Sequence, residues 1–293
     1  MDVFPLFQLP LVAMEHILSM MNPFEFELTE GIRERWSFDW TTDKSEIGYE
    51  TNDSTESIEH KVVKYSENPI GDLMKWHYYI KEVLGCQFDS ISFNLSLVPN
   101  QNRLISDRIF SHQASIPRMI IYSSRDESED VKYLLNKIKS CDKLFLFGDH
   151  YEDNFHVEIP EGRSFLIINN AGFFNYEQLL GLKYQHIILR GLTLTNQEIN
   201  GFLKSYIACE SHLDLNTIEI TIQSGDIMDV IMDIPHEETT DLDTLKKLTR
   251  NRFLFNDTKA YNIHRFDGKM ASAIMTRAQD TFNLCLAIHD ADS

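Results

Sequence analysis

Short apolar runs recur along the middle of the chain, and each has the length of one β-strand. Successive runs begin about 20 to 30 residues apart. Helical spacing of apolar residues falls in several gaps, most clearly over 131–138 and 199–207, and Thr195 and Glu198 have the spacing of a capping box. Strand, crossover and strand at this interval predicts a parallel sheet. The expected strands are Ile91–Val98, Arg118–Tyr122, Lys143–Phe147, Ser164–Ile168, His186–Arg190 and Thr217–Ile222.

The interval between these strands favours one of two α/β architectures. Strand starts only a little over 20 residues apart leave little room for full crossover helices, and 149–162 has no helical stripe. We therefore expect a leucine-rich-repeat-like curved, mainly parallel sheet with helices. A doubly wound α/β domain remains the alternative, because the regular leucine-rich signature is missing.

The segments that flank the repeats differ from them in pattern. Before them, 41–61 is polar and acidic, which predicts an exposed loop or an edge hairpin, and 69–84 has the spacing of an amphipathic helix. After them, 261–266, 270–274 and the alternating apolar residues of 282–288 predict antiparallel strands that close the sheet. Asp267-Gly268 predicts a type I′ hairpin turn between the first two.

The first residues of the chain predict a short docking helix. Pro5 and Pro10 favour an extended lead-in followed by a helix, and Asn22-Pro23 ends that helix. The apolar stripe on this helix is larger than a few turns can bury alone, so a partner is expected; a flap on the protein's own core is the alternative. The stripe consists of Leu11, Met14, Leu18 and Met21, with Ile17 beside it.

Two segments resemble one protein family, in the order in which that family has them. The Phe-Pro-Leu lead, Leu9-Pro10, Ile17-Leu18 and the following Asn-Pro-Phe-Glu resemble the F-box of nematode F-box proteins. Residues 192–204 and 261–271 resemble the type 2 F-box-associated domain of the same proteins. The chain departs from the F-box pattern at 28–36, where the family has a further helix.

The resemblance implies a substrate-recognition subunit of a cullin-type ubiquitin ligase. It implies a small, truncated, helical F-box-like module over 1–40 and a substrate-binding F-box-associated domain over 41–293. The departure at 28–36 leaves an alternative, a non-ligase binder or inhibitor that sequesters its partner. The residues expected to bind the Skp-type adaptor are Pro5, Leu6, Leu9, Pro10, Ile17, Leu18, Met21, Asn22 and Pro23.

Composition and charge limit the classes of partner. A hydrophobic content of 43% is typical of a globular protein. The formal net charge of −18 disfavours general attachment to nucleic acid or to anionic lipid and favours a basic surface on the target. No apolar segment has the length of a membrane span, and no leader is expected, so we expect a cytoplasmic or nuclear location.

The sequence predicts no catalytic, metal or cofactor site. Its four cysteines are widely spaced without a Cys-x-x-Cys pair, and no phosphate loop, nucleophile elbow or dinucleotide fingerprint is present. We therefore expect an interaction protein rather than an enzyme, with the concave face or a loop edge of the sheet as its recognition surface. Phe173, Phe174 and Tyr176 are candidate partner-binding residues, with a place in the core as the alternative.

Overall fold

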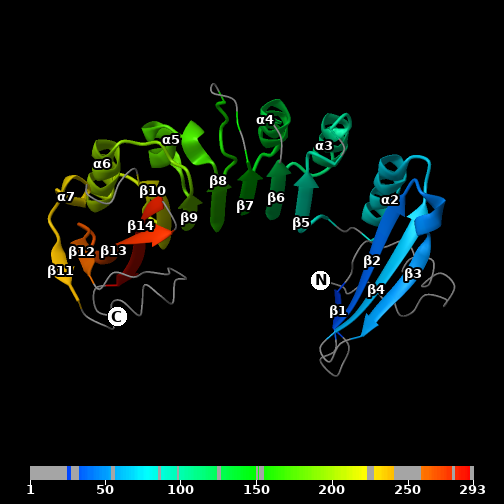
Figure 1. The fold of residues 1–293 in the computed structure, drawn as a ribbon, viewed down its shortest axis with the longest axis horizontal. Coiled ribbons are helices and arrows are strands. Elements are labelled where there is room, and N and C mark those ends of the chain that lie inside the picture. Colours follow the sequence, from blue (N-terminus) through cyan, green and yellow to red (C-terminus); the bar gives the residue numbers. More distant parts are fainter. Residues whose placement is uncertain are drawn as a thin grey trace. The chain divides into compact units, whose positions relative to one another are not determined.

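The computed structural model describes most of the chain, as two compact units, Met1–Gln87 and Phe88–Ser293 (Figure 1). Each unit is described by itself below. The described residues are 25–27, 33–53, 57–84, 87–97, 99–123, 127–149, 151, 155–222, 228–240, 259–278 and 281–290.

The first unit contains a four-stranded sheet in the order β1-β2-β4-β3. β2 and β4 are parallel, whereas β3 and β1 each pair antiparallel with a neighbour. Every residue of the edge strand β3 is exposed, in agreement with the polar sequence of this segment and with the predicted edge hairpin. The elements are β1 (Glu25–Glu27), β2 (Arg33–Thr41), a 3-10 turn (Lys44–Glu46), β3 (Gly48–Asp53), β4 (Ser57–Tyr65) and α2 (Pro69–Leu84).

Helix α2 begins where the local sequence predicts. Pro69 is its first residue. The N–H at this position has no partner within a helix, so proline, which lacks it, costs no hydrogen bond there. The side chain of Asn68 accepts a hydrogen bond from the backbone N–H of Gly71 at 3.0 Å, which satisfies one of the free donors of the first turn.

The expected helical module over 1–40 is not supported by its described part. Residues 33–41 form β2, which pairs over its whole length with β4. Residues 25–27 form β1, and residues 1–24 lie outside the described part of the chain. The boundary between the two compact units lies after Gln87. The functional division at residue 40 stays a prediction.

The second unit contains a ten-stranded mixed sheet. Six strands follow chain order and pair in parallel, and three antiparallel strands and a short edge strand complete the sheet in the order β11-β12-β13-β14-β10-β9-β8-β7-β6-β5. The parallel strands are β5 (Ser90–Asn94), β6 (Arg118–Ser123), β7 (Lys143–Gly148), β8 (Phe165–Asn169), β9 (His186–Leu189) and β10 (Thr217–Ile222); the others are β11 (Glu237–Thr239), β12 (Ala260–His264), β13 (Lys269–Ala278) and β14 (Thr281–Asp290).

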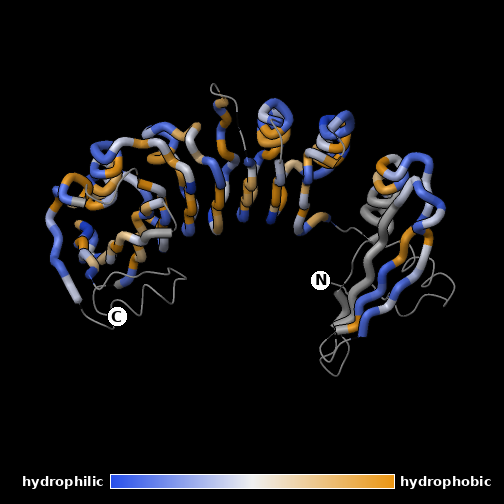
Figure 2. Tube along the Cα trace, in the orientation of Figure 1, coloured by the Kyte–Doolittle hydropathy of each residue, from blue (hydrophilic) through white to orange (hydrophobic). Residues whose placement is uncertain are grey.

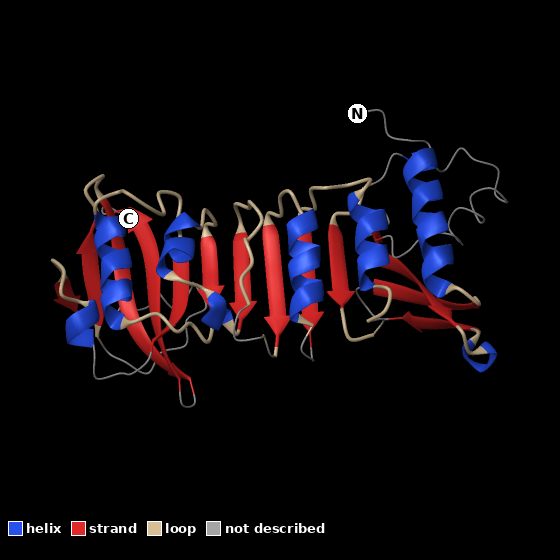
Figure 3. Cartoon of the chain, turned by 90° about the horizontal axis from the view of Figure 1, so that it is seen from above, coloured by secondary structure: helices blue, strands red, loops and turns tan. Residues whose placement is uncertain are grey.

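All six expected strands of the parallel region are confirmed, as are the two clearest crossover helices. Figures 1 and 3 show the described helices of this unit along one side of the sheet, the outer side of its curve. Strand order that follows chain order, with helices on one face, distinguishes this unit from the doubly wound alternative. The helices are α3 (Asn102–Phe110), α4 (Ser128–Lys137), α5 (Tyr176–Gly181), α6 (Asn196–Ile207) and α7 (Met228–Ile231), with a 3-10 turn at Ala171–Phe173.

The core lies between the helices and the sheet. One set of alternate strand residues is fully buried there, together with the apolar stripes of α4 and α6. Figure 2 shows the hydrophilic residues of α3 and α4 on the side away from the sheet. The capping box between Thr195 and Glu198 is confirmed, and Asn175 and Gln178 form a second one. The central strand residues of this core are Met119, Ile121, Leu144, Leu146, Leu166, Ile168, Ile187, Leu189, Ile218 and Ile220.

The C-terminal strands are antiparallel, as predicted, but the turn type is not the expected one. Of the two central residues, only Gly268 has a positive φ, at 90°, whereas a type I′ turn requires positive φ at both. The carbonyl of Arg265 accepts from the N–H of Gly268, and the N–H of Arg265 donates to the carbonyl of Lys269. This pattern is a three-residue loop in which a glycine bulge follows an ordinary turn.

Candidate functional site

The inner face of strands β6 to β9 is an apolar surface that no described helix covers. Sequences such as KLFLFG in β7 and FLIIN in β8 are nearly continuous apolar runs, which are typical of strands buried on both faces. Here only one face is buried against the helices. The other set of alternate residues is half-buried or exposed, and we call it the aromatic face: Ile120, Tyr122, Phe145, Phe147, Phe165, Ile167, His186 and Ile188.

The strand register places these side chains in rows across the sheet. Ile120, Phe145 and Ile167 are register partners, in the middle row. Tyr122 stacks on Phe147 in the next row, with ring centroids 5.4 Å apart. Both are large rings held rigidly by the strands, so they offer contact area at little cost in conformational entropy.

The lower row, at the amino ends of the strands, combines an aromatic ring with an imidazole. Phe165 stacks on His186 with centroids 4.4 Å apart. A ring nitrogen of His186 lies 2.9 Å from the hydroxyl oxygen of Thr217. Partial burial disfavours the charged imidazole and therefore lowers the pKa of His186. A neutral imidazole extends the apolar surface of this row.

The aromatic face has a polar border on both sides. The corresponding positions of β5 are exposed serines and an asparagine, and those of β10 are Thr217, Glu219 and Thr221. Arg190 and Glu219 form an ion pair of 3.8 Å at the β10 border. An apolar centre with a polar border is the usual anatomy of a protein–protein interface.

Beyond β10 the same face of the sheet is closed. Ala260, Ile274, Cys285 and Ala287 form a buried cluster on β12 to β14, and the strand register places them on the side that carries the aromatic face. The accessible part of the inner face is therefore confined to β5–β10. Burial raises the pKa of the Cys285 thiol to about 12, so this cysteine is an inert core residue.

Two cations lie at one corner of the aromatic face. Arg118 of β6 and Lys143 of β7 are register partners, and both are exposed. The guanidinium carbon of Arg118 lies 5.3 Å from the centroid of the Phe145 ring. Within the described part of the chain, neither cation forms an ion pair.

The three predicted partner-binding aromatics lie on the helical side of the sheet, in the loop and helix that follow β8. Phe174 is buried. Phe173 contacts the rings of Tyr151 and Phe155 edge-on, with centroids 5.4 and 4.8 Å away. Tyr176 is half-buried as the first residue of α5. Their role in binding stays a prediction. The nine predicted adaptor-binding residues lie outside the described part of the chain.

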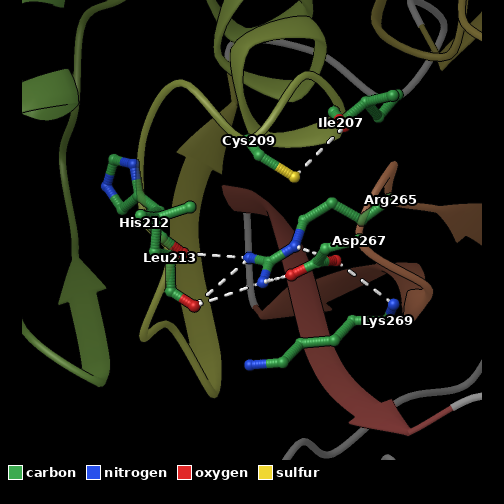
Figure 4. A network of polar contacts seen from close by, with 7 residues as sticks. All are labelled: Ile207, Cys209, His212, Leu213, Arg265, Asp267 and Lys269. Carbon is green, nitrogen blue, oxygen red and sulfur yellow. Dashed lines mark hydrogen bonds and ion pairs between the residues drawn. The ribbon is translucent and has the colours of Figure 1, made fainter.

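A buried arginine explains the second sequence motif, 261–271. The guanidinium of Arg265 donates to the carbonyls of His212 and Leu213 (Figure 4). It also forms a bidentate ion pair with the carboxylate of Asp267, with an Nε to Oδ1 distance of 2.8 Å. The backbone N–H of Phe266 also donates to the carbonyl of Ile207, at the end of α6. This motif therefore joins the β12–β13 turn to the loop after α6, which is a structural role.

His212 is buried beside this cluster with its imidazole against the ring of Phe202, at 5.0 Å between centroids. Burial lowers its pKa to about 4. Neither ring nitrogen has a hydrogen-bond partner among the described residues. His212 is therefore neutral at pH 7. The folded state loses stability when the pH falls, because the buried imidazole resists protonation.

The described residues contain no group of three or more His, Cys, Asp or Glu side chains that could bind a metal ion. None of the helices among these residues is long and apolar enough to cross a membrane.

Comparison with known proteins identifies one segment of the second unit. A family model described as F-box associated matches residues 154–220, which include β8, α5, β9, α6 and the first part of β10. No curated protein and no solved structure matches the chain. The match includes the first of the two motifs of the second unit that resemble the F-box-associated domain, and it supports the presence of such a domain.

Proposed function

We propose that this protein is a substrate-recognition subunit of a cullin-type ubiquitin ligase. Its N-terminal segment would bind a Skp-type adaptor, and the aromatic face of its second unit would bind the target protein. The protein would perform no chemistry of its own and would act in the cytoplasm or nucleus.

The observation that supports target binding most strongly is the uncovered aromatic face. Large apolar side chains gather on four adjacent strands with no described helix over them, and contiguous accessible apolar patches mark interaction sites. Tyr122 and Phe165 are the most exposed of them, at 42% and 37%. The match of residues 154–220 to an F-box-associated model supports the same role, since β8 and β9 of this face belong to that segment.

Adaptor binding is tested by co-purification. The full chain should form a stable complex with a Skp-type adaptor, and the double variant Leu9→Asp, Leu18→Asp should lose it, because two carboxylates replace apolar contacts of the predicted lead-in and docking helix. The second unit should keep its circular dichroism spectrum in this variant. Failure of the wild-type protein to bind any Skp-type adaptor would refute the ligase role.

Target binding is tested with two matched double variants. Tyr122→Ser with Phe165→Ser removes the most exposed rings of the aromatic face. Leu104→Ser with Leu213→Ser removes side chains of comparable exposure, 48% and 54%, away from that face. Proteins that co-purify with the wild type when the proteasome is blocked should not co-purify with the first variant and should co-purify with the second. Equal recovery from both variants would place the binding surface elsewhere.

A second function, sequestration without degradation, is favoured by one observation. Residues 33–41 form β2, in the region where the resembled F-box has a further helix. A protein with a degenerate F-box would bind its partner through the same face but would not deliver it to a ligase. Partner levels that do not respond to cullin or proteasome inhibition would support sequestration; levels that rise on inhibition would support the ligase role.

A further inference from the structure

We infer that the aromatic face binds a short apolar segment of a partner protein that carries a carboxylate, and that Arg118 and Lys143 bind this carboxylate. The inference rests on the proposed function, because it specifies the chemistry of the target that the face would take.

The dimensions of the face favour a segment over a whole globular surface. Four strands at a spacing of about 4.8 Å span about 15 Å, and the three rows of the face together span about 13 Å in the direction of the strands. A helix with its side chains is about 10 to 12 Å wide, so one helix or one extended strand covers the face. A standard interface of about 800 Å² per partner would extend well beyond it.

The two cations are placed unfavourably for the isolated protein. Arg118 and Lys143 lie opposite each other on neighbouring parallel strands, where like charges repel. The carbonyl of Asp89 accepts from the backbone N–H of Arg118, and Asp142 directly precedes Lys143. Among the described residues, neither carboxylate forms an ion pair with these two cations. A carboxylate from a partner would remove this repulsion.

The surroundings of the cations favour a carboxylate within an apolar segment. The guanidinium of Arg118 lies over the Phe145 ring, so this positive charge stands directly beside the apolar side chains of the face. The chain as a whole carries a net charge of −18, and an acidic partner would be repelled by most of its surface. The cation pair therefore attracts an acidic group to one corner of the aromatic face, which fixes the position and direction of the bound segment.

Selection from a random displayed peptide library, with the full chain as bait, tests this inference. We expect the wild-type protein to enrich peptides that combine large apolar residues with Asp or Glu. The variant Arg118→Glu with Lys143→Glu should not retain these peptides and should favour Lys or Arg instead. The matched control Lys132→Glu with Lys204→Glu changes the net charge equally on the helical side and should enrich the wild-type peptides.

A synthetic peptide from the selection gives the magnitude. Replacing its acidic residue by the isosteric amide should lower the affinity about three- to tenfold, as expected for one partly exposed ion pair. The same replacement should have no effect on binding to Arg118→Gln with Lys143→Gln.

The outcomes separate this inference from the proposed function. One outcome is that the selected peptides fail to bind Tyr122→Ser with Phe165→Ser, show no enrichment of Asp or Glu, and still bind Arg118→Glu with Lys143→Glu. This outcome would overturn the inference and leave the aromatic face as the binding surface. Peptides that still bind after Tyr122→Ser with Phe165→Ser would refute the proposed surface itself. Enrichment of no peptide by the wild-type protein would also overturn the inference, because a single segment would then not suffice.

Discussion

Replacement of Gly268 by a residue with a side chain should destabilise the second unit through backbone conformation alone. Gly268 has φ of 90°, in the left-handed region that side chains disfavour. A Cβ built on this glycine meets no atom within 4 Å. Steric overlap with neighbours is therefore absent, and the whole cost comes from the conformation that the β12–β13 turn requires.

The expected magnitude follows from that cost. Left-handed conformation costs an L-residue about 1 to 2 kcal/mol, and a β-branched side chain adds to it. Gly268→Ala should therefore lower the free energy of unfolding by about 1 kcal/mol, and Gly268→Val by more. Gly181, the last residue of α5, is the matched control, because its Cβ would also meet nothing within 4 Å and its φ is negative. Gly181→Ala should stabilise by about 0.5 to 1 kcal/mol.

Two spectroscopic probes assign the change to the correct unit. All three tryptophans, Trp36, Trp40 and Trp76, belong to the first unit. Thermal unfolding followed by far-UV circular dichroism should give Gly268→Ala a melting temperature about 4 to 8 °C below that of Gly181→Ala. The transition seen by tryptophan fluorescence should not change. Equal melting temperatures for the two variants would refute the role assigned to positive φ at this turn.

Three further predictions concern the same unit. Leu146→Ala should cost about 3 kcal/mol of unfolding free energy in urea titration, because it leaves a cavity in the centre of the sheet. Burial lowers the pKa of His212 to about 4, from about 6.5 in the unfolded chain, so its contribution to stability is complete above pH 6.5 and is lost as the pH falls toward 4. Between pH 7.5 and 5 the wild type should therefore lose more unfolding free energy than His212→Asn. Asparagine is the chosen replacement because it tolerates the positive φ of this position. Truncation after Asp257 removes the strand β14 that lies between β13 and β10, so it should yield insoluble or protease-sensitive protein rather than a folded protein that merely fails to bind.

Local sequence determined the elements of the second unit and their order. Each parallel strand is a run of strand length that is either mainly apolar or alternates apolar and polar residues, and each clear crossover helix has its own apolar stripe. Thr195 and Glu198 also cap α6. These signals depend on residues close in sequence, so they are visible without the fold. Helix α3 was not predicted. Leu104 on it is 48% exposed and several of its buried residues are polar, so its apolar stripe is weak.

Local sequence predicted the turn at Gly268 and the candidate binding residues only in part. Asp-Gly correctly predicted a tight turn with positive φ at the glycine. The loop is one residue longer than expected because it also contains Phe266, whose backbone N–H donates to the carbonyl of Ile207, a residue distant in sequence. Phe173, Phe174 and Tyr176 follow a strand in the sequence, but local sequence does not indicate that they lie on the helical side of the sheet.

The tertiary structure alone decided which face of the sheet is open. In β6 to β9 both sets of alternate residues are mainly apolar, a pattern typical of strands that are buried on both faces, whereas β5 and β10 alternate apolar and polar residues. From the sequence we expected the concave face or a loop edge as the recognition surface but could not choose between them. The contrast in strand pattern was the one local signal for an interaction surface. Its meaning depends on where the helices pack, because an apolar strand face becomes a binding site only when the protein's own fold leaves it uncovered.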